Sequence, residues 1–349
     1  MSTRAERVTL AQIASAAAVS VSTVSKVVNG RPDVAPQTRA LVQRVLHDLS
    51  YEPRRVDGSR ARAIALLFHG PLMTYSLEIM EGVLATAAEV EADVVVARID
   101  TSAQAARRIY ERAASDWQAV IAVTTVAAEM SVLSRAHVPT VVIDPVGVPQ
   151  SDVVSVGSTN FTGGLTATQH LLELGHRRIA YLGGTPGSAC NQARLQGFRG
   201  AMEAVGAPIR KGYTRSGIFE YNDGLVQGAA LLELPHPPTA VFAANDEMAL
   251  GVLEAARARG LRVPEDLSVV GFDDTEIARV ASPQLTTVAQ PLRRMGAVAL
   301  RTALRLGAGE HIDSHHVELA TELVVRGSTA EPPAELSAAR TKRRRIQSA

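Results

Sequence analysis

Apolar residues recur every three or four positions in three short runs near the N-terminus, the pattern of helices that bury one face. The first run begins at Thr9, whose spacing from Gln12 matches a capping box. The second follows Ser20, a favoured helix cap, and stops at Asn29. The expected buried faces are Leu10, Ile13, Ala14 and Ala17; Val24, Val27 and Val28; and, in a third helix over 36–49, Leu41, Val42, Val45, Leu46 and Leu49. Three such helices can just close the core of a small domain.

From Ile64 onward, short apolar runs of strand length alternate with amphipathic runs of helical length. Strands are expected at 64–68, 93–97, 119–123, 140–143, 153–156, 179–182, 240–243 and 268–272, and helices at 77–90, 103–114, 160–174, 193–205, 223–232 and 246–259. This alternation predicts parallel sheets covered by helices on both faces. The region is longer than one sheet comfortably holds, so the pattern favours two similar lobes.

Composition narrows the class of protein. The 349 residues are 46% hydrophobic and 20% charged, enough to bury sizeable cores. The single cysteine, Cys190, excludes a disulfide framework or a cysteine metal cluster within one chain and fits a reducing compartment. The N-terminus shows no signal-peptide pattern, and no apolar run has the length of a membrane span. These features favour a cytoplasmic protein without membrane contact.

The net charge of +1 conceals an uneven distribution. Residues 1–62 hold ten basic and five acidic side chains, residues 63–330 hold 21 and 28, and residues 331–349 hold five and two. A basic N-terminal segment on an acidic body indicates that only this segment meets a polyanion, although ordinary fluctuation remains the alternative. The basic run KRRR at 342–345 is read as part of a solvated tail rather than as a DNA contact.

The N-terminal stretch TLAQIASAAAVSVSTVSKVVNG, followed by VAPQTRALVQRVLHDLSYEP, resembles the DNA-binding head of the lactose-repressor (LacI/GalR) family of bacterial transcription regulators. Later stretches, including HLLELGHRRIAYLGG (170–184) and TAVFAANDEMALGVLEAARARGLRVPEDLSVVGFDDTE (239–276), resemble the effector-binding core of that family, which is related to periplasmic sugar-binding proteins. Ala18 stands where the family usually has a glycine in its turn. The segment IALLFHGPLMTYSLEIMEGV faintly resembles a subgroup linked to the use of plant polysaccharides.

The resemblance implies a multidomain chain, with an all-α three-helix helix-turn-helix head and an α/β two-lobed core like that of periplasmic binding proteins. The expected domains are 1–52 for the head, 53–63 for the linker, 64–327 for the core that binds effector and dimerises, and 328–349 for a disordered basic tail. Family members carry a hinge helix with a leucine in the linker. No leucine lies between Tyr51 and Ile64 here, so a hinge helix and a flexible tether both remain open.

The resemblance assigns base reading to the first, second and sixth residues after the capping serine, here Val21, Ser22 and Lys26. Val21 offers an apolar contact to a thymine methyl, Ser22 can donate or accept, and Lys26 can donate to guanine O6 or N7. Phosphate contacts, which position the head, are expected from Ser20, Thr23, Ser25, Asn29 and Thr38. Thr9 is a further DNA-binding candidate, and Arg54 and Arg55 can contact phosphates or the minor groove. Serine and threonine residues that only cap helices are the alternative.

The resemblance places the effector between the lobes, at the carboxyl ends of strands. The matching positions are Arg194, Phe219, Asn245, Asp273 and Gln290, and the N-terminal lobe adds Tyr75 and Glu78. The planar fork of Arg194 can hold two neighbouring hydroxyls, Asp273 can accept from two, and Phe219 offers a face to a sugar ring. This chemistry favours a sugar over a purine or a phosphate. A purely structural Arg194–Asp273 pair is the alternative.

The implied function is that of a transcriptional repressor that binds a palindromic operator in double-stranded DNA as a homodimer or a tetramer and is released by a small-molecule effector. One alternative is a corepressor-dependent regulator that responds to a non-sugar metabolite such as a nucleobase. Another is a sugar-binding receptor without DNA function, which would need a signal peptide and no head. An enzyme is disfavoured, because no catalytic motif is present and the adjacent Asp273 and Asp274 are expected to point apart. The cluster HIDSHH (311–316) is interpreted as an exposed loop without metal, and no cofactor is expected.

Overall fold

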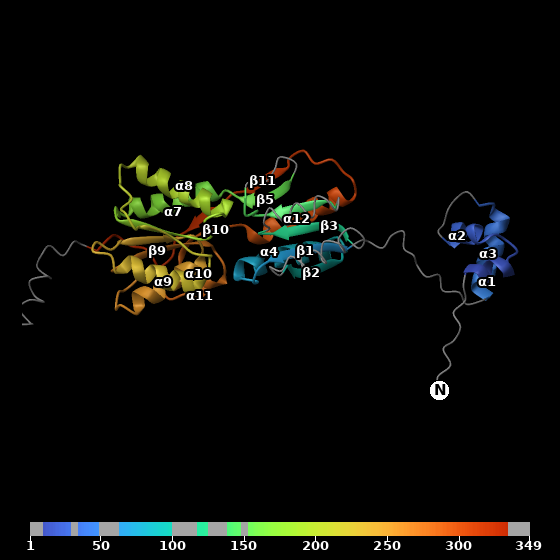
Figure 1. Cartoon of the computed structure of the whole chain (residues 1–349), viewed down its shortest axis with the longest axis horizontal. Coiled ribbons are helices and arrows are strands. Elements are labelled where there is room, and N and C mark those ends of the chain that lie inside the picture. Colours follow the sequence, from blue (N-terminus) through green and yellow to red (C-terminus); the bar gives the residue numbers. More distant parts are fainter. Residues whose placement is uncertain are drawn as a thin grey trace, which may run out of the picture. The chain divides into compact units, whose positions relative to one another are not determined.

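The computed structural model describes residues 10–28, 34–48, 63–99, 117–124, 138–147 and 153–333. The chain divides into two compact units, 1–61 and 62–349 (Figure 1). Within the described segments, no helix combines the length and the apolar character that a membrane span requires. Several predictions fall outside these segments: Thr9, Asn29, Arg54, Arg55, the linker, the helix at 103–114 and the tail beyond 333.

The N-terminal unit contains three helices, α1 (Leu10–Ala16), α2 (Val21–Val28) and α3 (Pro36–Asp48). Ile13, Val24 and Val42, one from each helix, are fully buried against one another, which confirms the predicted core. The prediction that Leu41 also faces this core is wrong, because its side chain is 43% exposed. Leu41 precedes Val42 by one residue and so points about 100° away around the helix.

The backbone conformation of the turn between α1 and α2 favours glycine, the residue usual at this position in the LacI/GalR family. Ala18 has a φ of 50°, in the left-handed region, where a residue with a Cβ is less stable than glycine by roughly 1 kcal/mol. After the turn, the Oγ of Ser20 accepts a hydrogen bond from the backbone N–H of Thr23 at 3.1 Å. This bond confirms the predicted cap and fixes the start of α2.

The larger unit has two lobes, each built on a six-stranded sheet, as the alternating pattern predicts (Figure 1). The N-terminal lobe has the order β11-β5-β4-β3-β1-β2, and the C-terminal lobe has the order β12-β10-β9-β8-β6-β7. The strands are β1 (Ala63–His69), β2 (Val94–Ile99), β3 (Trp117–Val123), β4 (Thr140–Ile143), β5 (Val154–Ser158), β6 (Ile179–Gly183), β7 (Thr214–Ser216), β8 (Ala240–Ala243), β9 (Ser268–Asp273), β10 (Thr286–Ala289), β11 (His316–Leu319) and β12 (Glu322–Val324). The described pairings are parallel except that of β10 with β12.

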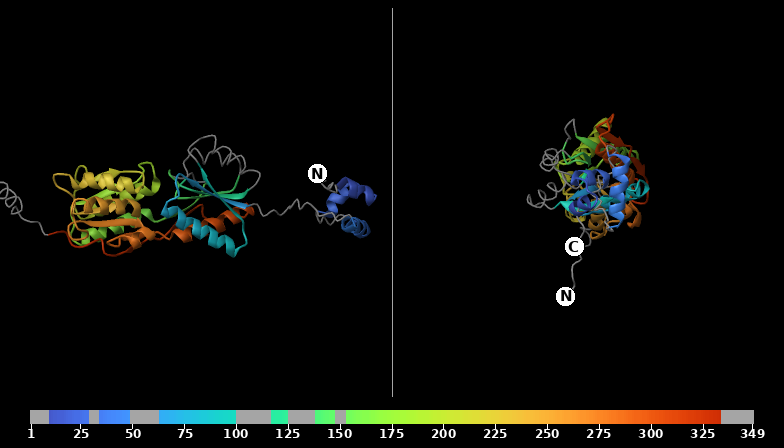
Figure 2. Two further views of the ribbon diagram at one scale, coloured as in Figure 1. Left: turned by 90° about the horizontal axis from the view of Figure 1, so that it is seen from below. Right: turned by 90° about the vertical axis from the view of Figure 1, so that its right-hand side faces the viewer.

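Helices cover these sheets in pairs. In the N-terminal lobe α4 (Thr74–Glu89) and α12 (Leu292–Gly307) lie side by side on one face (Figure 2). In the C-terminal lobe α7 (Asn160–Glu173) and α8 (Ala189–Ala204) cover one face, and α9 (Tyr221–Leu232) and α10 (Asp246–Arg257) cover the other, with the short α11 (Glu276–Val280) beside α10. The sequence missed α11, α12 and the strands β7, β10, β11 and β12. The exposed His316, expected in a loop, begins β11.

Each helix pair crosses at facing glycines. A Cβ added to Gly82 of α4 would lie 2.0 Å from the carbonyl oxygen of Arg293, and one added to Gly296 of α12 would lie 2.3 Å from that of Ile79. The same relation holds for Gly164 with Gly197 and for Gly224 with Gly251, with clash distances of 2.1 to 2.3 Å. Only glycine permits such close approach of two backbones, so these positions set the spacing of the helices.

Three segments connect the lobes: β5 to α7 through Thr159, β10 to α12 through Gln290, and β11 to β12 through Thr321. Two of them are bonded directly. The backbone N–H of Thr321 donates to Oγ1 of Thr159 at 3.0 Å, and the N–H of Thr159 donates to the carbonyl of Leu319 at 2.9 Å. These two connecting segments are therefore hydrogen-bonded to each other at the hinge.

The predicted start of a disordered tail at residue 328 is wrong. Ser328 is fully buried, its hydroxyl donates to the carbonyl of Val269 at 2.6 Å, and it accepts from the N–H of Thr286 at 2.8 Å. Two residues later the carbonyl of Ala330 lies 2.9 Å from Nε2 of the buried His176. These bonds extend the folded core past the predicted boundary.

Candidate functional site

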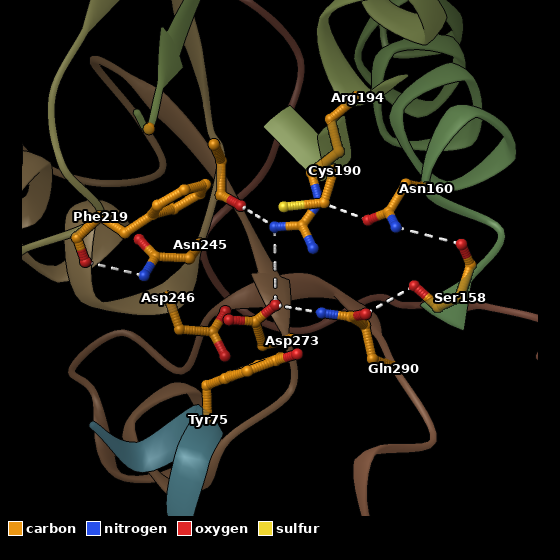
Figure 3. Close-up of polar contacts among 12 residues, drawn as sticks. Tyr75, Ser158, Asn160, Cys190, Arg194, Phe219, Asn245, Asp246, Asp273 and Gln290 are labelled. Carbon is orange, nitrogen blue, oxygen red and sulfur yellow. Dashed lines mark hydrogen bonds and ion pairs between the residues drawn. The ribbon is translucent and has the colours of Figure 1, made fainter. Parts of the chain in front are cut away.

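Polar side chains from both lobes converge where the parallel strands end (Figure 3). Asp144 directly follows β4, Asp273 ends β9, and Asn245 lies two residues beyond β8. The carboxyl edge of such sheets is the usual ligand site of an α/β fold, because chain direction changes there and leaves a crevice. The structure brings together Tyr75, Arg194, Phe219, Asn245, Asp273 and Gln290 among the predicted effector residues.

Arg194 lies at the centre of this group and is only 2% exposed. Its Nε donates to Oδ1 of Asn160 at 2.8 Å, its Nη1 donates to the carbonyl of Ala244 at 2.6 Å, and the guanidinium stacks 3.7 Å from the ring centre of Phe272. Nη1 also lies 3.7 Å from Oδ1 of Asp273. Nη2 makes no hydrogen bond to another described residue. The fork is thus held rigidly, with one donor group left for a ligand.

Asp273 is bound to Gln290 as well as to Arg194. Nε2 of Gln290 donates to Oδ1 of Asp273 at 2.6 Å, and Oδ2 has no hydrogen bond within the described part of the chain. Burial raises the pKa of Asp273 well above its ordinary value, although the nearby Arg194 opposes that rise. As predicted, Asp274 points elsewhere, and it pairs with Arg326 at 2.6 Å. Asp273 can therefore act alone as an acceptor toward the site.

Asn245 fixes the start of α10 and the segment before α9. Its Oδ1 accepts from the N–H of Met248 at 3.0 Å, and its Nδ2 donates to the carbonyl of Phe219 at 2.9 Å and to Oε2 of Glu247 at 3.0 Å. The ring of Phe219 lies against Gly184, where an added Cβ would approach it to 2.2 Å. The amide of Asn245 is thus bonded mainly to protein atoms, and its bond to the Phe219 carbonyl holds that residue at the site.

The N-terminal lobe contributes Tyr75 and Asp144. The hydroxyl of Tyr75 donates to Oδ2 of Asp144 at 2.5 Å, and burial raises the pKa of Tyr75 well above its ordinary value. The prediction for Glu78 is not supported by its position: it forms a 2.6 Å ion pair with Arg293 of α12. Glu78 lies one turn further along α4 and turns toward the neighbouring helix rather than toward Arg194.

The two lobes touch across the site at its edges. Oγ1 of Thr74, the first residue of α4, donates to Oε1 of Glu247 at the start of α10. The N–H of Ala189, the first residue of α8, donates to the carbonyl of Val146 at 3.0 Å. Each contact joins a helix N-terminus of one lobe to the other lobe, so the two contacts link the lobes beside the site.

Sequence reasoning missed several residues that line or support the site. Asp144, Cys190, Asp246 and Glu247 lie in it, and Ser158 and Asn160 hydrogen-bond to Gln290 and Arg194. Asp144 carries the same signal as Asp273, a carboxylate directly after an apolar strand, and could have been found. Cys190 lies one helical turn before Arg194 on α8, and burial raises the pKa of its thiol, which makes it a weak nucleophile. No cluster of three metal-ligating side chains occurs among the described residues.

Acidic side chains outnumber basic ones in the described part of the site. Asp144, Asp246, Glu247 and Asp273 are less than 9% exposed, and the buried guanidinium beside them is that of Arg194. Such a site suits a neutral ligand that donates hydrogen bonds better than an anion, because an added phosphate would bring its charge among buried acidic groups with one guanidinium to balance it. Hydroxyl groups meet this requirement.

Asp246, which lies beneath Asp273, provides a pH test. Burial raises its pKa to about 7, against the opposing effect of hydrogen bonds from Thr287 and Thr275. Between the pKa of Asp246 in the unfolded chain and about pH 7, the native state keeps a proton on Asp246 that the unfolded state has lost. The free energy of unfolding therefore falls as the pH rises through that window. Asp246→Asn keeps the acceptor toward Thr275 and removes the ionisation. This variant should lose on the order of 2 kcal/mol less unfolding free energy than the wild type between pH 5 and 8, measured by melting curves. An unchanged dependence of stability on pH would contradict the assignment.

The head presents a separate polar face. Val21 is 48% exposed on α2, Lys26 is exposed on the same helix, and Thr23 and Thr38 are half-buried. Ser22 and Ser25 lie within α2, and their side chains fall outside the described structure. Val21 and Lys26 thus present an exposed apolar side chain at the start of α2 and an exposed cation in its last turn.

Known proteins show the same organisation. Residues 9–54 match the model of bacterial regulatory proteins of the lacI family, and residues 168–329 match a periplasmic binding protein-like domain. The regulator DegA of Bacillus subtilis is 32% identical over 93% of this chain and 98% of its own length. The structure of a CelR–cellobiose complex is similar with a TM-score of 0.73 at 35% identity, covering 92% of this chain and all of that one.

The structure of a Lac repressor dimer bound to operator and an anti-inducer is similar with a TM-score of 0.72 at 29% identity, over 93% of this chain and all of that one. The helix-turn-helix head and the α/β core with its parallel sheets agree with these relatives. They are transcriptional regulators rather than enzymes. The chain therefore belongs to the LacI family and is a DNA-binding transcriptional regulator.

Proposed function

We propose that this regulator is a repressor that binds a palindromic operator as a homodimer and is released when a neutral sugar binds between the two lobes. The observation that carries the proposal is the buried site itself. Nη2 of Arg194 and Oδ2 of Asp273, both without a hydrogen-bond partner among the described residues, provide a donor and an acceptor beside the ring of Phe219. That combination suits adjacent hydroxyls on one side of a sugar and its C–H face on the other.

The acidity of the site argues for an unphosphorylated sugar. Asp144 and Asp273 come from opposite lobes, and burial raises the pKa of both carboxyl groups, so negative charge is disfavoured there. A neutral sugar can hydrogen-bond to both carboxyl groups, whereas a sugar phosphate would add charge beside them with only Arg194 nearby to balance it. The similar CelR structure contains cellobiose, which makes cellobiose the first sugar to test.

The exposed face of α4 supports a homodimer. The glycine crossing buries one side of this helix on α12, and Leu77 and Leu84 are 46% and 39% exposed on another side. Pairing of two copies through Leu77 and Leu84 would present two heads to two half-sites and roughly double the contact energy. The similar Lac repressor structure is a dimer on its operator.

The test starts from DNA sites selected out of a random library by the full-length protein. Fluorescence anisotropy on the enriched palindrome then measures affinity without sugar, with cellobiose and with glucose 6-phosphate. We expect cellobiose to weaken binding by at least about tenfold, with no effect of glucose 6-phosphate. Failure to enrich any palindrome would contradict the operator proposal. Tightening instead of release would favour the corepressor alternative, and a response to the phosphate alone would contradict the neutral-sugar assignment.

Lys26 tests the reading helix. Its ammonium is exposed on α2, where it can donate to guanine in the major groove. Lys26→Ala should weaken the selected operator by about 10-fold and relax the preference at one base pair of each half-site, because one specific contact is worth ~1–3 kcal/mol. Library selection with the variant measures this. Uniform weakening without any change in base preference would show that Lys26 contacts phosphate only.

A further inference from the structure

Five side chains in the site form a closed ring of contacts (Figure 3). Arg194 lies 3.7 Å from Asp273, and Asp273 accepts from Gln290 at 2.6 Å. Gln290 accepts from the hydroxyl of Ser158 at 2.5 Å. The carbonyl of Ser158 accepts from Asn160 at 3.1 Å, and Asn160 accepts from Arg194 at 2.8 Å. The two charged groups of the site thus reach the same residue, Ser158, by two routes.

The two amides in the ring have no freedom to rotate. Oε1 of Gln290 accepts from Ser158 while Nε2 donates to Asp273, and Oδ1 of Asn160 accepts from Arg194 while Nδ2 donates to the Ser158 carbonyl. Exchanging oxygen and nitrogen in the Asn160 amide would place its NH2 group against the Nε–H of Arg194 and its oxygen against the Ser158 carbonyl. The same exchange in Gln290 would place an amide oxygen against Oδ1 of Asp273. All five residues are at most 8% exposed, so water does not compete with these bonds.

The ring joins different parts of the fold. Ser158 is the last residue of β5 in the N-terminal lobe, and Asn160 is the first residue of α7 in the C-terminal lobe. Gln290 lies between β10 of the C-terminal lobe and α12 of the N-terminal lobe. The ring therefore includes two of the three connecting segments. The hydroxyl of Thr159, which lies between Ser158 and Asn160, binds the third segment and makes no hydrogen bond to another described residue of the ring.

We propose that Ser158 is a positioning residue that transmits the state of Arg194 and Asp273 to the hinge, and that Gln290 serves this link rather than contacting the effector. The inference rests on the proposed function for its biological use. A ligand that draws Arg194 and Asp273 toward itself changes the two routes to Ser158 together. The hinge then responds to ligand binding through directional hydrogen bonds. Both routes end at Ser158, one at its hydroxyl and the other at its carbonyl.

The first experiment needs no effector. Hydrogen–deuterium exchange of the segments containing Ser158 and Gln290 is followed in the full-length wild type, in Arg194→Met, in Ser158→Ala and in the double variant. We expect each single change to speed exchange in both segments by at least about fivefold, and the double variant to add little to either. Additive effects, or an effect of Arg194→Met confined to α8, would overturn the link whatever the effector is.

The second experiment measures operator affinity by anisotropy with and without cellobiose. In Ser158→Ala the cellobiose Kd should stay within about threefold of the wild-type value, while the weakening of operator binding shrinks to within about twofold. Ser158→Thr keeps the hydroxyl and should retain most of the response. Thr159→Val is the matched control, because it removes a hinge hydroxyl outside the ring, and it should respond as the wild type does.

The outcomes separate the two proposals. If Thr159→Val loses the response as fully as Ser158→Ala, the hinge needs hydroxyls in general and the specific role of Ser158 is overturned. The same conclusion follows if Ser158→Ala responds normally. If the wild type itself ignores cellobiose, the choice of sugar fails, and the exchange experiment still decides whether the ring couples the site to the hinge.

Discussion

Replacing Arg194 with methionine is expected to abolish release by the sugar while the protein still binds its operator. Methionine keeps the unbranched apolar stem of the side chain and removes every donor, including the Nη2 group in the site and the bonds to Asn160 and to the carbonyl of Ala244. A hydrogen bond to a charged group is worth ~1.5–3 kcal/mol, and two lost contacts to a sugar correspond to a loss of affinity of about 100-fold or more.

The change also leaves Asp273 buried without its cation. Since burial already raises the pKa of this carboxyl, loss of Arg194 raises it further and favours the neutral acid. Breaking a buried pair typically costs ~3–5 kcal/mol of stability, part of which is recovered when the remaining carboxyl takes up a proton. We therefore expect Arg194→Met to be less stable than the wild type and to be relatively more stable at low pH.

The measurements are sugar titrations by thermal shift and operator titrations by anisotropy on the full-length variant. Arg259→Met is the matched control, because Arg259 also pairs with a carboxylate, Glu233, but at the surface of the same lobe, where such a pair contributes at most ~1 kcal/mol. The control should keep both affinities. A normal sugar response in Arg194→Met would show that the effector binds elsewhere.

The resemblance to the LacI/GalR family supplied the predicted effector residues, and one rule explains why several of them converge. Parallel strands deliver their last residues to a single edge, so Asp273 after one apolar run and Asn245 after another lie close together. The same rule applies to Asp144, which follows the run at 140–143 and was overlooked. For this residue the hydrophobic pattern offered a signal that the resemblance did not.

The roles of these residues were less accessible, because they depend on partners from other elements. Glu78 turns toward Arg293 of α12, a helix that the sequence reading did not include, so its true partner could not be foreseen. Gln290 and Asn245 use both ends of their amides on protein atoms, which is decided by distances of a few tenths of an ångström. No periodicity in the sequence records such distances.

A substitution far smaller than Arg194→Met should damage the protein as severely. Gly197→Ala adds one methyl group to α8 where it would lie 2.2 Å from the carbonyl oxygen of Phe161 and 2.6 Å from the N–H of Leu165 in α7. These are backbone atoms that cannot turn aside, so the helices must separate and the core between them must open. We expect a loss of about 3 kcal/mol or more in the free energy of unfolding, measured by urea denaturation.

Gly200 offers the same substitution three residues later on α8, which makes the comparison decisive. A Cβ at Gly200 meets nothing within 4 Å, so Gly200→Ala should stabilise the helix by up to ~1 kcal/mol. Equal effects at both positions would mean that the close crossing of α7 and α8 is not maintained in solution.

The crossing of α7 and α8 also affects the sugar site, because a Cβ on the opposing Gly164 would lie 2.3 Å from the carbonyl of Arg194. Separation of the two helices would move the guanidinium away from Asn160, which begins α7, so Gly197→Ala should weaken sugar binding in whatever fraction remains folded, and Gly200→Ala should not.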